Sequence, residues 1–324
     1  MSNLPAQIPP TVDRLQEFNQ YYNHTIHPEL VRLERQRKRF IRLLLISAVL
    51  LAGVVTFEII IDELLLTLAM MIPIGLYVVY LLYRFRHFRQ QFKPQVVNLI
   101  LDFLDDGPNY GELSYMPEKN IPTGAFVGSK LFDLPNNPQD YSYDGEDYIE
   151  GKIGTMNFGM SELRVKKKSQ VRNRLNYVFS GVFLVSELTG KHKGAVLLWP
   201  REFKQYLTRE LKLIDREGGK AVAGMLQVKG FNERFIVRAT RESAVRKLLN
   251  DEIQKSILEY RNQTDKPIYL SIIGNQVFVA ITEHRDLLEP SLWQSNLSYD
   301  LVREFFADIN ASLELVRRLD GFLV

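Results

Sequence analysis

Histidines are the residues of this chain best suited to metal or acid–base chemistry, and two of them lie close together. His24 and His27 are three positions apart, a spacing that places both side chains on one face of a helix. A zinc site needs three or four ligands held by further hydrogen bonds, and no other ligand lies near this pair in the sequence. We therefore expect no metal site there, and the remaining histidines have no local partners either.

Two segments resemble catalytic loops only in part. Residues 151–155 contain a glycine pair and a lysine but lack the G-x-x-x-x-G-K-[ST] spacing, so a hairpin turn is favoured over a phosphate loop. Ser161 lacks the second glycine of a nucleophile elbow, and Ser129 stands alone. The chain contains no cysteine, which excludes disulfides and cysteine nucleophiles. The sequence predicts no catalytic residue, cofactor or metal, and it favours a non-enzymatic protein.

A cluster of positive charge is the strongest candidate for a binding surface. Its members lie between two expected strands: Arg164, Lys166, Lys167, Lys168, Arg172 and Arg174. A solvated hairpin tip explains them, and so does contact with anionic lipid or an acidic protein partner. A basic residue close to an anionic leaflet contributes about 1 kcal/mol of attraction. Nucleic acid is not an expected partner, because no aromatic side chains for base stacking are interleaved and the net charge is only +3.

Two long apolar segments near the N-terminus predict a transmembrane helical hairpin. They span residues 40–61 and 64–83, and each meets the roughly 20 residues that cross ~30 Å of hydrocarbon, the first with Arg42 and Glu58 at the two interfaces. The alternative is a buried helical pair in a soluble protein, but core helices rarely stay apolar on every face for this length. Neither span carries a central ionisable residue, so an anchor is favoured over a channel or transporter.

The charges that border the two spans predict their orientation. Basic residues flank the hairpin and acidic residues occupy its turn: Arg32, Arg35, Arg37, Lys38, Arg39 and Arg42 before it, Arg84, Arg86, Arg89 and Lys93 after it, and Glu58, Asp62 and Glu63 between the spans. Because positive residues stay in the cytoplasm, both termini are expected to be cytoplasmic.

Small residues in the first span predict close helix packing inside the membrane. Ala48 and Ala52 are four positions apart, and Gly53 is adjacent, which allows two helices to approach closely. Self-association of the hairpin is one form that this packing can take. Apolar residues at intervals of three or four further predict cytoplasmic amphipathic helices over residues 1–39 and 84–104.

Residues 105–324 predict a cytoplasmic α+β domain. Strand patterns over 177–188, 195–199, 268–273 and 276–281 cluster as hairpins, which indicates a mainly antiparallel sheet. Helices are expected over 201–216, 242–260 and 299–319. Residues 105–147 contain many turn signals, so short strands around 124–132 are expected there, and 225–228 is a further strand candidate.

Several motifs, taken in order, resemble an uncharacterised bacterial membrane family, the domain of unknown function DUF3137. They are Phe18-Asn-Gln-Tyr-Tyr22 with His27-Pro-Glu-Leu30, Gly151-Lys-Ile-Gly154, Phe179-Ser-Gly-Val-Phe183, Phe235-Ile-Val-Arg-Ala239 and the run from Ile272 to Ile281. The resemblance covers most of the chain, apart from a long loop over 110–147. It implies a two-helix anchor in the bacterial inner membrane and a cytosolic β-rich domain, and it supplies no reaction.

The function expected from these features is that of a membrane-anchored interaction or scaffold protein. Its expected partners are membrane lipids, a membrane or cytosolic protein, and a second copy of the chain. The family resemblance points to LemA-type membrane coiled-coil proteins as the protein partner. The alternative is a membrane-tethered enzyme or ligand sensor whose site forms only in the fold.

Overall fold

The computed structural model describes residues 11–61, 64–107, 109–168, 175–189, 194–208, 212, 222–284, 288, 295 and 297–321. The chain divides into two compact units. The first comprises Met1–Phe103 with Leu287–Arg303, and the second comprises Leu104–Asp286 with Glu304–Val324.

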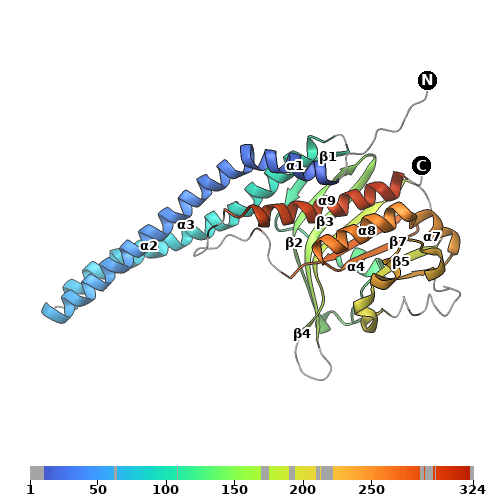
Figure 1. The fold of residues 1–324 in the computed structure, drawn as a ribbon. Helices are drawn as coiled ribbons and strands as arrows, with labels where there is room; N and C mark the ends of the chain where they lie inside the picture. The colour runs from blue at the N-terminus through green and yellow to red at the C-terminus, as the bar shows by residue number, and fades with distance from the viewer. Residues whose placement is uncertain are drawn as a thin grey trace. The chain divides into compact units, whose positions relative to one another are not determined.

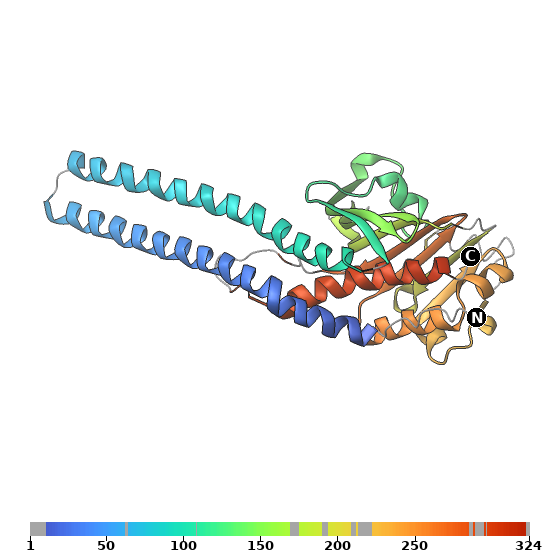
Figure 2. The same ribbon diagram turned by 90° about the horizontal axis from the view of Figure 1, so that it is seen from above.

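The first unit is built on a long helical hairpin. One arm consists of α1 (Thr11–Tyr21), a π-helical turn η1 (Tyr22–Ile26) and α2 (His27–Ile61). The other arm is α3 (Leu64–Asp105), which passes through Pro73 and Pro94 without ending. Both views show the arms side by side (Figures 1 and 2).

The π-helical turn has a cause in the sequence. Pro28 has no N–H, and its ring would clash with the carbonyl group four residues earlier in a regular α-helix. The preceding turn is wider, since the N–H of His27 donates to the carbonyl of Tyr22, five residues back. The helical arm therefore passes Pro28 through a local widening and continues.

Contacts along the hairpin fix its register. Phe18 packs on Phe103 with ring centroids 5.3 Å apart, and Phe40 packs on Phe88 at 5.9 Å. Near the turn, the hydroxyl of Thr67 donates to the carboxylate of Glu58. The sum of the two residue numbers stays nearly constant from pair to pair, as antiparallel packing requires.

The second unit contains an eight-stranded sheet with the order β1-β2-β3-β4-β8-β7-β5-β6. The strands are β1 (Tyr110–Met116), β2 (Tyr141–Ile153), β3 (Met156–Lys168), β4 (Leu175–Glu187), β5 (Ala195–Pro200), β6 (Phe235–Ala239), β7 (Ile268–Ile273) and β8 (Gln276–Thr282). Every described pair of neighbours is antiparallel. The α+β prediction is confirmed.

Short helices and two long ones complete the described part of the fold. They are α4 (Thr123–Gly128), η2 (Pro138–Asp140), η3 (Arg201–Tyr206), η4 (Val222–Met225), α6 (Phe231–Arg234), α7 (Glu242–Leu248), α8 (Asp251–Thr264) and α9 (Tyr299–Gly321). The hydroxyl of Tyr260 on α8 donates to Asp308 on α9 at 2.8 Å, and α8 lies beside α9 in front of the sheet (Figure 1).

Several local predictions were wrong. Residues 123–128 form a helix where strands were expected, and residues 222–225 form a 3-10 turn that overlaps the predicted strand at 225–228. The helix predicted over 242–260 is two helices, because the Asn250 side chain accepts a hydrogen bond from the N–H of Ile253 and begins a new one. Of the helix predicted over 201–216, only residues 201–206 are described as helical, and most of the remainder lies outside the described residues.

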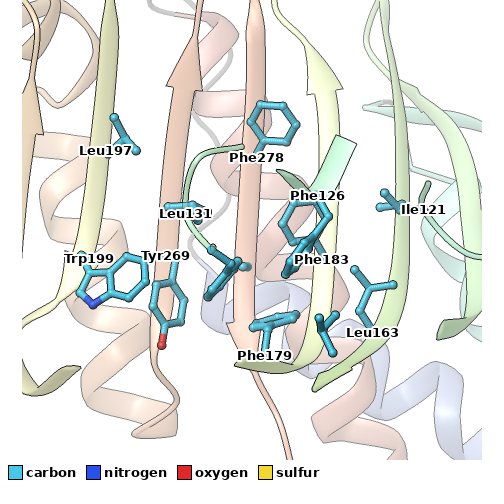
Figure 3. Close-up of a cluster of buried hydrophobic side chains, with 13 residues drawn as sticks. Ile121, Phe126, Leu131, Leu163, Phe179, Phe183, Leu197, Trp199, Tyr269 and Phe278 are labelled. Atoms are coloured by element: carbon cyan, nitrogen blue, oxygen red, sulfur yellow. The ribbon is translucent and has the colours of Figure 1, made fainter. Parts of the chain in front are cut away.

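An aromatic core fills one face of the sheet. Phe126 stacks on Phe132 with centroids 5.1 Å apart, and both belong to the segment before β2. They meet Phe179, Trp199 and Tyr269 from three strands of the sheet (Figure 3). Such clusters bury a large apolar area per residue, so this segment is a structural layer and not a loose loop.

Gly181 is required where β4 meets β8. Its φ of +145° disfavours other residues, and a Cβ atom would overlap the carbonyl oxygen of Ile281. Gly181 pairs with Thr282 at this point of the ladder. The close approach of the β4 and β8 backbones therefore requires glycine at this position.

We predict that Gly181→Ala lowers the free energy of unfolding by at least about 2 kcal/mol, because two backbones must move apart. Gly128→Ala is the matched control: it lies at the end of α4 with open space around its Cβ position, so it should be neutral or stabilising by up to about 1 kcal/mol. Urea unfolding of the full chain measures both. Equal effects of the two substitutions would contradict the explanation.

Candidate functional site

The most unusual surface of the protein lies on the hairpin. Among the described residues, most of the exposed large apolar side chains fall between Leu45 and Tyr83, and several are far more exposed than a soluble protein tolerates in one place. Val49 is 71% exposed, Ile59 79% and Leu65 82%. Two helices are long and apolar enough to cross a membrane, as judged by length and composition.

The dimensions of this apolar band suit a bilayer. At a rise of about 1.5 Å per residue, the span from Leu43 to Ile61 is roughly 28 Å long, and that from Leu64 to Tyr83 is roughly 30 Å. The hydrocarbon of a typical bilayer is about 30 Å thick.

A collar of positive charge borders the apolar band on both arms. Its exposed members are Arg32, Arg35, Lys38, Arg39, Arg42, Arg84, Arg86 and Arg89. The antiparallel register brings the two sets to the same level of the hairpin. Two of the predicted flanking charges do not belong to the collar: Lys93 is buried, and Arg37 is buried against Glu34, to which its Nε donates at 2.8 Å.

The predicted small-residue surface lies on the outside of the hairpin. Ala48, Ala52 and Gly53 are all exposed, whereas Ser47 and Val54 are buried. Packing of α2 on α3 therefore does not use the small residues. Their role in contact with a further helix stays a prediction.

The described members of the basic cluster are divided between the two faces of β3. β3 extends to Lys168, so Arg164, Lys166, Lys167 and Lys168 lie on a strand, while Arg172 and Arg174 lie outside the described residues. Successive strand residues point to opposite faces. Arg164 donates to Glu146 at 2.9 Å and to Glu162 at 2.8 Å, which compensates its charge.

The remaining lysines of the cluster differ in their surroundings. The Lys166 ammonium lies 4.7 Å from the centroid of the Tyr177 ring. Lys167 and Lys168 are exposed. Contact of these residues with anionic lipid or an acidic partner stays a prediction.

Three carboxylates near Arg164 lie close enough together to share a metal ion. Oxygen atoms of Glu146, Asp147 and Glu162 lie within 4.8 Å of one another. The Arg164 guanidinium already bridges two of these carboxylates, and the hydroxyl of Tyr115 donates to Asp147. Internal partners thus account for the cluster.

The serine side chains considered for catalysis make hydrogen bonds that stabilise the fold. The buried hydroxyl of Ser161 accepts from the N–H of Ile121 at 3.1 Å. That of Ser129 donates to the carbonyl of Phe126 at 2.6 Å and so closes α4. Residues 151–155 form the β2–β3 hairpin, in which Ile153 pairs with Met156 and Gly154 has a φ of +59°, as the turn interpretation predicted. His24 and His27 are both exposed.

The second unit contains a buried ionic cluster that was not predicted from the sequence. The Lys266 ammonium lies 2.6 Å from Glu283, 2.9 Å from Glu304 and 2.7 Å from Asp308. Tyr260 completes the cluster through its hydrogen bond to Asp308. These residues are far apart in sequence, and only Glu304 and Asp308 have a helical spacing that could have suggested a shared partner.

Burial controls the protonation of this ionic cluster. It raises the pKa of Asp308, although Lys266 and Tyr260 partly offset the effect, and it raises the pKa of Tyr260 well above its ordinary value. Burial lowers the pKa of Lys266, but the surrounding carboxylates outweigh this and raise it overall. The cluster therefore consists of one ammonium, three carboxyl groups and a neutral phenol.

Comparison with known proteins gives a family match for part of the chain. Two long apolar helices precede an eight-stranded antiparallel α+β unit, and residues 177–320 match the family described as "Protein of unknown function (DUF3137)". The DUF3137 resemblance is thus confirmed for this part of the chain.

Among solved structures, the mycobacterial trehalose monomycolate transport factor A, TtfA, aligns with a TM-score of 0.35 at 9% identity. The alignment covers 65% of this chain and 89% of that chain. A likeness at this level carries no conclusion about function. No curated protein sequence matches the chain.

We predict that Lys266→Met lowers the free energy of unfolding by about 3–5 kcal/mol near neutral pH, because it leaves buried carboxylates without their cation. Protonation of those carboxylates would relieve the repulsion. A carboxyl group whose folded-state pKa is raised favours folding at low pH and loses that contribution as pH rises. The variant should therefore recover part of its stability between pH 8 and pH 5.

The control for this prediction is Lys255→Met, on the exposed side of α8, which should change stability by less than about 0.5 kcal/mol. Urea unfolding of the full chain in detergent at several pH values measures both variants. A loss for Lys266→Met that does not depend on pH would contradict the assignment.

Proposed function

We propose that this protein is a non-enzymatic, membrane-anchored interaction or scaffold protein of the bacterial inner membrane. The observation that supports this proposal most directly is the band of exposed apolar side chains between Leu45 and Tyr83. In water, each fully exposed aliphatic side chain forfeits about 1.5–3 kcal/mol of burial free energy. Hydrocarbon removes this cost without any partner protein.

Polar side chains within the band support insertion. The hydroxyl of Ser47 donates to the carbonyl of Leu43, and that of Thr56 donates to the carbonyl of Ala52, each at 2.9 Å. Inside a bilayer, polar groups must find partners within the protein, because water is absent. Side chains that bond their own helix meet this condition.

The orientation follows from the positive collar, which would remain at the cytoplasmic surface. Both termini would then be cytoplasmic, and the acidic turn would lie on the opposite side. The rest of the chain would be held at the cytoplasmic face as a binding module.

The interaction role rests on two supports. The neighbourhoods of Ser129 and Ser161 are structural, so they do not favour an enzyme. Ala48 and Ala52 lie on the exposed side of α2, which suits contact with a second hairpin. A LemA-type partner is expected from the family resemblance alone, and photo-crosslinking in native membranes followed by mass spectrometry would identify it or exclude it.

Cysteine labelling tests the anchor and its orientation, and the natural chain provides a cysteine-free background. Glu63→Cys places a thiol in the acidic turn, and Gln91→Cys places one at an exposed position beyond the collar. In intact cells whose outer membrane is permeable to the reagent, a charged maleimide should label Glu63→Cys. It should label Gln91→Cys only after the inner membrane is opened.

The reverse pattern would overturn the proposed orientation. Equal labelling of both thiols in closed spheroplasts, together with release of the protein by alkaline carbonate, would overturn the anchor itself.

A further inference from the structure

A cavity lined by aromatic side chains lies in the second unit. Lys167, near the C-terminal end of β3, forms part of its lining. The volume of the cavity is about 710 Å³. Phe132, Phe179, Trp199 and Tyr269 form part of its lining and are themselves 3–6% exposed. Three of them stand on neighbouring parts of one sheet face (Figure 3). The cavity therefore opens directly onto the end of the aromatic core.

Exposed aromatic rings also line the cavity. Tyr177 on β4 is 58% exposed, and Tyr206 in η3 is 66% exposed. Large aromatic side chains usually lose such exposure when a protein folds, since their burial is strongly favourable. The Tyr177 ring already has the Lys166 ammonium 4.7 Å from its centroid, so Tyr206 is the exposed ring that gains most from covering a flat apolar group.

The polar atoms of the buried rings are already satisfied. The indole N–H of Trp199 donates to the carbonyl of Phe203 at 3.2 Å. Tyr269 is hydrogen-bonded to Thr282, and burial raises the pKa of its phenol to about 12, so it stays neutral. The rings can therefore accept another ring by stacking or edge contact without losing a hydrogen bond.

The ionisable groups that line the cavity favour a ligand with negative charge. Its ionisable lining groups, apart from the tyrosines, are Lys167, His284 and Asp133. Asp133 already has an interaction partner within the protein. Lys167 is exposed and has no ion-pair partner among the residues that the structure describes. An anionic group would therefore gain a charge-assisted contact there, with His284 as a further donor.

We propose that this cavity binds a small aromatic anion, whose ring contacts the aromatic lining and whose carboxylate, phosphate or sulfonate group contacts Lys167. The volume falls in the range of about 300–1,000 Å³ that is typical of small-molecule sites. Aromatic rings dominate the apolar lining, which favours a flat ring over an alkyl chain. The assignment is independent of the membrane anchor, because every residue that it uses belongs to the second unit.

Equilibrium dialysis of the full chain in nanodiscs, with empty nanodiscs as the blank, tests this proposal. The probe is 2-naphthoate, and its neutral amide and the alkyl anion octanoate are the comparison ligands. Saturable binding of naphthoate is expected, with weaker binding of both comparison ligands.

Two variants locate the anion contact. Lys167→Gln should weaken naphthoate binding about tenfold, the order expected for loss of one charge-assisted hydrogen bond, and should leave the amide unaffected. Lys168→Gln is the control, because it removes the same charge from the adjacent residue, which is not part of the lining. It should change binding less than about twofold.

Three results would overturn the proposal: no saturable binding above empty nanodiscs, equal binding of octanoate and naphthoate, or the same effect of Lys167→Gln and Lys168→Gln. None of these results bears on the anchor, which cysteine labelling tests separately.

Discussion

The exposed apolar side chains of the helical hairpin need hydrocarbon around them, and the rest of the proposed arrangement depends on this constraint. Side chains such as those of Val49 and Leu65 are exposed on their helices. This exposure is unfavourable in water and favourable in hydrocarbon. The hairpin meets the other requirement of that environment, because Thr67 donates to Glu58 and Ser47 bonds its own helix. The positive collar then assigns the two sides of the membrane. The proposed role as an anchored binding module follows from this arrangement.

The second unit meets a different constraint, since it must bury both apolar and charged groups within one sheet fold. Aromatic rings such as Phe126 and Phe183 fill one face of the sheet, and Gly181 permits the close approach of two strands. An ammonium group, Lys266, is surrounded by carboxylates and links the segment before β7 to the residue after β8 and to α9. Burying these charges is acceptable only because they are paired. The aromatic cavity lies where the ring cluster reaches the surface.

Periodicity in the sequence was sufficient to predict the helical hairpin and the strands β4, β5, β7 and β8, because both patterns are local. It failed where local signals compete: Asn250 begins a new helix within an amphipathic run, and residues 123–128 form a helix in a region dense with turn signals. The ionic cluster around Lys266 joins residues that are distant in sequence, so no spacing reveals it. The exposure of Ala48 and the pairing of Arg164 likewise depend on the tertiary fold.

Spin-label accessibility measures the solvent of the hairpin directly. A nitroxide on Leu50→Cys, in the full chain in nanodiscs, reports collisions with oxygen, which concentrates in hydrocarbon, and with a nickel chelate, which stays in water. A second label on Ala52→Cys would show reduced access to both reagents if hairpins associate through the small residues. If the hairpin spans a bilayer, oxygen accessibility at Leu50→Cys is high and nickel accessibility is low. High nickel accessibility, or low accessibility to both reagents because protein covers the site, would contradict this placement in the bilayer.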